Sequence, residues 1–418
     1  MPGATTTRLS RLTAVEVDTL AMLTWRLPRK RILISHPYIH PVGGGNAVAA
    51  WAIQALLQDY DVTLALLGPI DIAGLNRNFG TSLDEHSFEV RVAPEKYRRL
   101  ARWMPTQGAL FESSLVVRWA KELDRENHFG VILSTQNEAD FGRPAIQYIH
   151  FPGWYLPRPA VEMKWFHHIP GLLNLYRSIC FRFSDVTKEG IRNNLSLANS
   201  TFVADRIRET HEGSDPVLLY PPVPGEFPDM DWNARRPAVI AVGRFASYKR
   251  WGMALEIVEA VRRKGHDLGF TLVGQIGHPD DVFEKQKLQD LAAERPWFRI
   301  LTDLTRQQLT EEIASHRYGI HTMENEHFGI AVAELQRAGC ITFVHATGGP
   351  VEIVGGDPRL TFLTPAEAAE KIAHAVSDEA TGRELLGLVQ SRRECFSTDR
   401  FSHSLREIVA EFERSHPA

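Results

Sequence analysis

The chain has 418 residues, a formal net charge of −4, and 44% hydrophobic and 23% charged residues. That length predicts two domains, the charge gives no bulk reason to expect nucleic-acid binding, and no apolar run is long enough to span a membrane. The three cysteines, Cys180, Cys340 and Cys395, have no metal-ligand or disulfide spacing, so a reducing, cytoplasmic compartment is expected.

Strand and helix patterns alternate through the first half of the chain. Residues 1–30 hold Thr, Arg and Asp in place of a long apolar core, which predicts an N-terminal extension ending in a short helix, not a signal peptide. Residues 31–220 form the first predicted domain, in which the acceptor is expected to bind. Its strands are expected at 31–35, 62–66, 88–92, 131–134, 145–149 and 195–198, with the clearest helices at 46–57 and 110–123.

The second half repeats this alternation after a break. The proline-rich stretch at 221–236 predicts an interdomain linker. Residues 237–395 form the second predicted domain, and residues 396–418 a C-terminal helix that returns to the first. Strands of the second domain are expected at 238–242, 270–273, 298–301, 318–323, 341–345 and 360–363, and helices at 251–264, 281–293, 305–315, 330–338 and 365–376.

Short apolar strands separated by helices are typical of parallel sheets covered on both faces. We therefore predict an α/β fold with two Rossmann-like, doubly wound parallel-sheet domains that face a central cleft. Open sheets of this kind bind ligands beyond the C-terminal ends of their strands, so polar residues that follow a strand are the candidates for a site.

The segment from His321 to Cys340 has the most informative pattern in the chain. A strand-like run is followed by a polar turn, a Phe-Gly step and an amphipathic helix pattern. Such a turn directs free backbone N–H groups and the positive end of a helix dipole at a ligand, which suits a phosphate. Glu326 precedes the helix and Glu334 is expected about two turns into it, so both carboxylates can face one cleft.

A second pattern opens the second domain. Gly243 ends a buried strand, and Arg244 and Lys249 follow in the loop before the next helix. Two fixed cations can neutralise a diphosphate without a metal ion, and the cleavage of a nucleotide sugar leaves a diphosphate whose charge must be stabilised. A solvated strand–helix loop is the competing interpretation of both residues.

A third pattern, Ala346-Thr-Gly-Gly-Pro-Val-Glu-Ile-Val354, holds two glycines that can let the backbone approach a ligand closely. In the order Gly-Arg…Lys, Glu-x7-Glu and Gly-Gly-Pro-x-Glu-Ile-Val, the three patterns resemble the retaining family 4 glycosyltransferases, which have the GT-B fold. Three segments resemble the α-1,2-mannosyltransferase subgroup that extends lipid-linked oligosaccharide: Asn325-Glu-His-Phe-Gly-Ile330, His36-Pro-Tyr…Gly43-Gly-Gly45 and Tyr148-Ile-His-Phe-Pro152. The resemblance is stronger over the second domain than over the first.

The resemblance implies roles for the matching positions of the second domain. Arg244 and Lys249 would hold the diphosphate, and Glu326 would contact the donor sugar near its reacting carbon. Glu334 would accept both ribose hydroxyls, which its two oxygens suit. Sugar and phosphate would also contact the backbone around Phe328, Gly329 and Ile330.

The first domain would contribute one side chain and one loop. By resemblance, His150 would lie beside the transferred sugar, and Gly44, Gly45 and Asn46 would form a loop against the phosphate or the acceptor. Plain structural interpretations stay open for these positions: a packed histidine at His150 and a flexible turn at the glycines. In the second domain Glu326 could equally cap a helix, and Glu334 could lie on a helix surface.

Together with these patterns, the resemblance implies a retaining glycosyltransferase that needs no cofactor and no metal. It would move a hexose, with mannose favoured, from GDP-mannose or a UDP-sugar to a hydroxyl of a glycan, lipid-linked or small-molecule acceptor. Asp229 and Asp231 match an Asp-x-Asp metal motif, but they follow no apolar strand. A nucleotide-sugar 2-epimerase of the same fold, an inactive binding subunit and a glycoside hydrolase are the alternatives; hydrolases place their two carboxyls about 5–10 Å apart.

Two stretches mix aromatic, apolar and basic residues. One covers residues 161–183, and the other comprises Arg98, Arg99, Arg102, Trp103 and Met104. Such mixtures can seat a protein peripherally at the cytosolic face of a membrane. They can equally form core helices whose cations extend to the surface.

Overall fold

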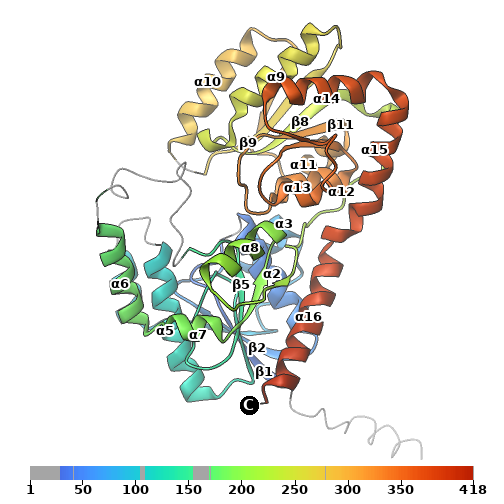
Figure 1. Ribbon diagram of the computed structural model, residues 1–418. Helices are drawn as coiled ribbons and strands as arrows, with labels where there is room; N and C mark the ends of the chain where they lie inside the picture. The colour runs from blue at the N-terminus through green and yellow to red at the C-terminus, as the bar shows by residue number, and fades with distance from the viewer. Residues whose placement is uncertain are drawn as a thin grey trace, which may run out of the picture.

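The computed structural model describes residues 29–40, 42–103, 109–153, 169, 171–277 and 279–417. The chain forms two α/β lobes, one above the other in Figure 1, each built on its own parallel sheet. The predicted N-terminal extension lies outside the described residues up to position 28, as do residues 161–168 of the first aromatic–basic stretch and Met104 of the second.

The sheet of the first domain has seven parallel strands in the order β3-β2-β1-β4-β5-β6-β7. This order reverses direction beside β1, which is the pattern of a doubly wound fold. The strands are β1 (Lys30–Ser35), β2 (Tyr60–Leu66), β3 (Glu89–Val92), β4 (Val131–Ser134), β5 (Ile146–Ile149), β6 (Leu195–Ala198) and β7 (Val217–Leu218).

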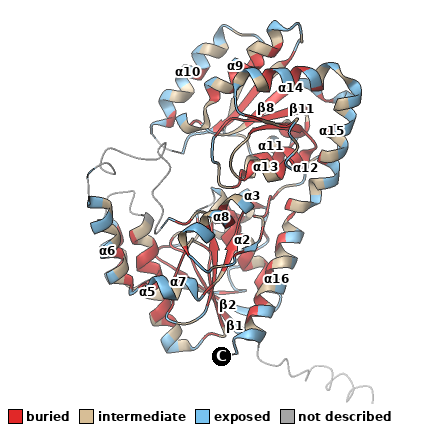
Figure 2. Cartoon of the chain, viewed as in Figure 1, coloured by how far each residue is buried: buried red, intermediate tan, exposed pale blue. Residues whose placement is uncertain are grey.

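Helices cover both faces of this sheet. They are α2 (Gly44–Leu56), α3 (Ile72–Phe79), α4 (Glu95–Trp103), α5 (Ala109–Asn127), α6 (Leu172–Ser184), α7 (Lys188–Arg192) and α8 (Thr201–Thr210). The apolar face of α2 packs on one side in a cluster with Ile32 and Ile34, whereas α5 packs on the other side with Leu33 and Ile132. Alternate residues of the strands thus bury on opposite faces, and Figure 2 colours the strands mostly as buried.

The sheet of the second domain has six parallel strands in the order β10-β9-β8-β11-β12-β13. They are β8 (Arg236–Arg244), β9 (Gly269–Gln275), β10 (Phe298–Thr302), β11 (His316–His321), β12 (Ile341–His345) and β13 (Thr361–Phe362). The helices are α9 (Trp251–Arg263), α10 (Asp281–Ala293), α11 (Arg306–Ala314), α12 (Ile330–Ala338), α13 (Pro350–Ile353), α14 (Pro365–Ser377) and α15 (Glu379–Arg392).

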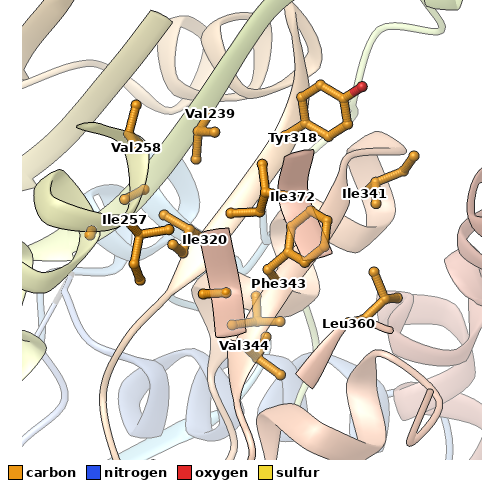
Figure 3. Packing of buried hydrophobic residues seen from close by; sticks show 14 of the residues in the cluster. Val239, Ile257, Val258, Tyr318, Ile320, Ile341, Phe343, Val344, Leu360 and Ile372 are labelled. Carbon is orange, nitrogen blue, oxygen red and sulfur yellow. The ribbon is translucent and has the colours of Figure 1, made fainter. Parts of the chain in front are cut away.

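The core of the second domain explains why these segments assemble. Ile257 of α9 and Ile372 of α14 pack in one apolar cluster with Ile320 of β11 and Phe343 of β12, as Figure 3 shows. The opposite face is covered by α11 and α12, where Leu335 lies in a second apolar cluster. Burial of such side chains is worth about 1.5–3 kcal/mol each, so the sheet is held firmly beneath the loops at its C-terminal edge.

The chain crosses between the two domains twice. The first crossing runs through residues 221–236, and the second runs from α15 into the last helix, α16 (Thr398–Ser415), which descends along the first domain in Figure 1. Phe401 and Leu405 of α16 join the same core as α2. The two crossings touch, because the backbone N–H of Val223 donates to the carbonyl of Phe396 at 3.1 Å.

The predicted α/β class with two doubly wound parallel sheets is confirmed. The sequence pattern does not predict β7, because a strand of two exposed residues shows no periodicity. It also places Glu334 too far along its helix: α12 begins at Ile330, so Glu334 is its fifth residue and lies just over one turn in.

Candidate active site

The two domains meet where the first turns of two helices face each other. Gly44 begins α2 and Ile330 begins α12, and a Cβ on Gly44 would lie well under 3.0 Å from the Ile330 side chain. Both N-caps are glycines in the left-handed region, Gly43 with φ 91° and Gly329 with φ 98°. The unpaired N–H groups and positive dipole ends of both helices therefore converge on one place, which suits an anion.

A cavity of about 280 Å³ opens beside these helix ends and is lined by both domains. The first domain contributes Gly43 and Gly44, and the second contributes the ends of β8 and β9 and the start of α12. Its charged lining residues are Arg244, Arg306 and Glu334. Two of the residues predicted from the Gly-Arg…Lys and Glu-x7-Glu patterns thus lie in one pocket.

Glu326 lies in the loop between β11 and α12, where two basic side chains meet it. The Lys249 ammonium donates to its Oε2, and the imidazole Nε2 of His321 lies 3.4 Å from the same oxygen. Burial alone would raise the pKa of Glu326, but Lys249 and His321 together outweigh burial and hold this pKa well below its ordinary value. The carboxylate is therefore ionised, and no further hydrogen bond within the described residues reaches Oε1.

Arg244 is the last residue of β8 and turns towards the pocket. Its guanidinium donates to the Tyr248 hydroxyl and lies 5.7 Å from that ring centroid. Its backbone carbonyl accepts from the Trp251 indole N–H at 2.9 Å, which ties the β8–α9 loop to the core. The loop therefore places two cations, Arg244 and Lys249, at the C-terminal edge of the sheet.

Glu334 is 6% exposed and has a basic partner inside the pocket. Arg306, the first residue of α11, donates to Glu334 Oε1 at 2.5 Å and to the carbonyl of Pro224 in the first crossing. Arg306 was not among the residues predicted from the sequence, because one arginine at a helix start carries no spacing signal. Its contact with Glu334 becomes visible only when α11 and α12 pack side by side.

The first domain places His150 against the start of α2. A Cβ on Gly45 would lie 3.3 Å from His150 Nε2, and that nitrogen is 3.1 Å from the carbonyl oxygen of Thr135. Asn46 Oδ1 lies 3.2 Å from Nε2 of the neighbouring His36. Burial lowers the pKa of His150 to about 4 and that of His36 to about 3, so both rings are neutral near neutral pH.

Residues of the Phe328-Gly-Ile330 step contact both the core and the cavity. The Phe328 ring is buried and packs 5.9 Å from the rings of Tyr220 and Phe396. Gly329 forms the N-cap of α12, and the Ile330 side chain lines the cavity. The phenylalanine thus anchors the turn while the following backbone faces the space between the domains.

The glycines of the third pattern lie close to protein backbone, and their predicted approach to a ligand stays a prediction. A Cβ on Gly348 would lie well under 3.0 Å from the backbone of Glu326, and one on Gly349 equally close to the backbone of His327. The Gly349 N–H donates to the Glu326 carbonyl at 2.8 Å. The two glycines therefore shape the loop that carries Glu326.

Glu352 of the same pattern connects the domains. Its carboxylate accepts from the N–H and the hydroxyl of Thr201, both at 2.7 Å, and from the Tyr220 hydroxyl at 3.1 Å. It therefore caps the start of α8 in the other domain. Nearby, the rings of Phe151 and His327 stack with centroids 4.2 Å apart. Glu352 has no role predicted from the sequence, because a contact between domains leaves no trace in local spacing.

The Asp-x-Asp pair of the linker has protein partners. Asp231 accepts from the Asn233 N–H at 2.7 Å, and Asp229 lies 3.5 Å from Arg393. Across the described residues, no cluster of three His, Cys, Asp or Glu side chains has the geometry to hold a metal ion. None of the helices described is both long enough and apolar enough to cross a membrane.

Comparison with known families gives one match to the second domain. Residues 225–386 match the family described as glycosyl transferases group 1. This range contains the three patterns that follow β8, β11 and β12, including Arg244, Glu326 and Gly349.

Curated relatives match the chain at low identity. The GDP-Man:Man(3)GlcNAc(2)-PP-Dol alpha-1,2-mannosyltransferase of Mus musculus is 24% identical over 87% of this chain and 86% of the mouse protein. The protein of the same name from Candida albicans is 24% identical over 78% of this chain, but only 62% of the fungal protein is spanned.

Solved structures share the fold. Sucrose-phosphate synthase from Thermosynechococcus elongatus has a TM-score of 0.64 at 16% identity, covering 93% of this chain and 100% of that structure. The Anabaena Alr3699/HepE structure in complex with UDP-glucose has a TM-score of 0.60 at 14% identity, covering 91% and 99%. The arrangement of two Rossmann-like domains is therefore the GT-B arrangement expected from the sequence.

Proposed function

We propose that this chain, a group 1 glycosyl transferase with the GT-B fold, moves mannose from GDP-mannose to a hydroxyl of a lipid-linked glycan with retention of configuration. The names of the relatives support this donor and this class of acceptor. The observation that carries the proposal is the contact between Lys249 and Glu326, made beside the converging starts of α2 and α12. Lys249 lies against Gly243, which lines the cavity, and Glu326 lies against Gly329 at the start of α12.

The diphosphate of the donor would lie between the two helix starts. Free N–H groups of α2 and α12, together with Arg244 and Lys249, would stabilise the charge that grows on the leaving diphosphate. These donors are fixed before the reaction, so little reorganisation is needed as the bond breaks. Because protein cations already supply the positive charge, we propose that transfer needs no metal ion.

The two glutamates would bind the two sugars of the donor, its mannose and its ribose. Glu326, with Oε2 held by Lys249 and His321, would turn Oε1 to the hydroxyls of the mannose. Glu334, held by Arg306 through Oε1, would accept from the ribose hydroxyls with its other oxygen. The two carboxylates thus serve different parts of one nucleotide sugar.

The acceptor would approach from the first domain. His150 is neutral and lies against Gly45 at the start of α2, where it would contact the transferred sugar. The acceptor hydroxyl would attack on the face that the diphosphate leaves, so the new bond keeps the original configuration. The leaving diphosphate would take up the proton of the attacking hydroxyl, and no covalent intermediate on the enzyme is required. Because the acceptor is lipid-linked, the protein would work at the cytosolic face of a membrane.

A transfer assay with defined substrates tests the proposal. Purified protein with GDP-mannose and a lipid-linked glycan acceptor is expected to form an α-linked mannosyl product, in the presence of EDTA as in its absence. Donor incubated without acceptor should stay unchanged, whereas conversion at carbon 2 would identify an epimerase. Failure to bind GDP, UDP or their sugars in a thermal-shift panel would point to an inactive subunit.

A further inference from the structure

The outer face of α6 carries an apolar stripe that the described part of the chain leaves exposed. Leu172, Leu175 and Ile179 are 42%, 59% and 52% exposed, and their spacing places them on one side of the helix. Arg182 continues the same side one turn later. Helix α6 stands at the outer edge of the first domain, coloured mostly as exposed or intermediate in Figure 2. The described stripe is therefore not part of a core.

The neighbouring α4 adds an exposed indole and a group of arginines. Trp103 is 83% exposed at the end of the helix. Three guanidinium groups share the single carboxylate of Glu95: Arg98 at 2.7 Å, Arg99 at 3.3 Å and Arg102 in a closer contact. One carboxylate cannot neutralise three cations, so this helix keeps a positive outer face.

A common support holds α4 and α6 together. Tyr97 of α4 and Phe183 of α6 place their ring centroids 6.4 Å apart, and both helices pack on α5 in one apolar cluster with Phe111. The buried face of α6 contributes Cys180 to this cluster. The inner faces of α4 and α6 are thus buried in this cluster. The exposed apolar stripe and the arginines lie on the outer faces of two firmly packed helices.

This combination fits the surface of an anionic bilayer. Leucine and isoleucine can enter the boundary between headgroups and acyl chains, tryptophan favours that boundary, and arginine attracts anionic headgroups. Another exposed apolar pair, Val282 and Phe283 on α10, is flanked by Asp280, Asp281 and Glu284. With Asp290 these acids outnumber Lys285 and Lys287 of the same helix, so α10 would be repelled by an anionic surface and the charge favours the first domain.

We propose that the α4–α6 face, defined as Arg99, Arg102 and Trp103 on α4 with Leu172, Leu175 and Ile179 on α6, seats the first domain on an anionic phospholipid bilayer. The inference deepens the proposed function and rests on it, because an enzyme that uses a lipid-linked acceptor gains from being held where that acceptor lies. The α4–α6 face belongs to the first domain, which is the domain proposed to bind the acceptor.

Vesicle binding of the intact protein tests this face without any substrate. The protein is mixed with vesicles of phosphatidylcholine alone or with added phosphatidylglycerol, and the bound fraction is measured by sedimentation. We expect binding only to the anionic vesicles. Arg99→Glu/Arg102→Glu should weaken it at least about tenfold, and Leu175→Glu/Ile179→Glu should weaken it by a similar factor.

Matched substitutions elsewhere provide the controls. Arg383→Glu/Arg414→Glu makes the same charge change at comparably exposed arginines, and Leu218→Glu/Leu363→Glu does so at exposed leucines. Both should bind vesicles like the unchanged protein. Equal loss in the controls, or full binding by both face variants, would overturn the proposed seat.

Transfer assays separate this inference from the proposed function. Both face variants should keep normal transfer to a water-soluble, short-chain acceptor, and should lose transfer to the same glycan on a long lipid in anionic vesicles. Absence of transfer by the unchanged protein would contradict the proposed function alone, since vesicle binding is measured independently. Equal transfer from vesicles by the variants would contradict the seat alone.

Discussion

Arg306 donates to Glu334 Oε1 at 2.5 Å, so the carboxylate expected to receive ribose is already held in place by α11. Within the described residues, Arg306 also reaches the carbonyl of Pro224 in the first interdomain crossing. The pocket wall, the candidate ribose ligand and the connection between the domains are therefore joined through one guanidinium. That relationship gives the first prediction.

Arg306→Ala should weaken GDP binding by about 1–2 kcal/mol, or roughly five- to thirtyfold in Kd, because Glu334 loses its partner and its orientation. Titration calorimetry with GDP and with 2′-deoxy-GDP measures the effect. The loss should shrink with the deoxy ligand, since the contact that Arg306 supports is then missing. Arg306→Lys keeps the charge and should lose less. Tighter GDP binding by Arg306→Ala would show instead that arginine competes with ribose.

Glu326→Gln should lower turnover by about a hundredfold or more, because the ionised carboxylate beside Lys249 disappears while the side chain keeps its size. GDP should bind nearly as before, since Glu326 is assigned to the sugar. Steady-state kinetics and thermal melting measure both points. Glu324→Gln provides the control: this exposed glutamate lies two residues before Glu326 in the same loop and pairs with Arg250, and its variant should work nearly normally. Near-normal turnover by Glu326→Gln would contradict the assigned role.

Gly349→Ala should impair the site indirectly, by displacing the loop that carries Glu326. The new Cβ would press on the backbone of His327, which is next to Glu326 and cannot move without shifting the loop. We expect a loss of roughly 1–3 kcal/mol in unfolding free energy and a clear fall in turnover. Gly387→Ala on α15 meets open space and should leave turnover unchanged and stability equal or slightly higher. An active, fully stable Gly349→Ala protein would show that the loop does not need this close approach.

Acid should destabilise the first domain through two buried histidines. Burial lowers the pKa of His36 to about 3 and that of His150 to about 4, from an ordinary 6.5. Below pH 6.5 these histidines therefore bind protons in the unfolded chain but stay neutral in the native state. The free energy of unfolding then falls as the pH drops towards their native pKa values. Each unit by which folding lowers the pKa of a histidine takes roughly 1.4 kcal/mol from the free energy of unfolding once the pH is below both pKa values. Denaturant unfolding over this pH range should give a shallower slope for His36→Asn than for the unchanged protein.

The exposed His86 gives the baseline for that experiment. His86→Asn makes the same chemical change in a turn open to solvent, so it should reproduce the slope of the unchanged protein. The absolute stability of His36→Asn is expected to drop, because its ring bonds Thr135 at 2.9 Å. The slope, and not the absolute value, is therefore the decisive measurement. Equal slopes for the two variants would contradict the assignment to His36.

Local pattern was enough to place most of the sheet strands. Runs such as Val131–Ser134 and Ile341–His345 are short, apolar and bounded by turns, so their period and length identify them. The same holds for α12, whose start follows the Phe-Gly step. The assigned roles of the candidate residues stay predictions, although the structure brings Lys249 to Glu326 and places Arg244 and Glu334 in one cavity.

Contacts between segments far apart in the sequence could not be predicted from local sequence patterns. Arg306 meets Glu334 across two helices, and Glu352 caps α8 of the other domain, so neither contact follows from neighbouring residues. The Gly348-Gly349 pair shows a related limit. The two glycines predict that another group comes close to the backbone here, and only the fold shows that the loop of Glu326 is such a group.

The return of α16 to the first domain has a consequence for synthesis of the chain. Phe401 and Leu405 fill the side of the core against which α2 rests, and Val409 lies in the same cluster. The amino-terminal half emerges first from the ribosome, yet its hydrophobic interior stays incomplete until α16 has been added, after the whole second domain. The later-made lobe can close earlier, reversing the usual order in which domains mature.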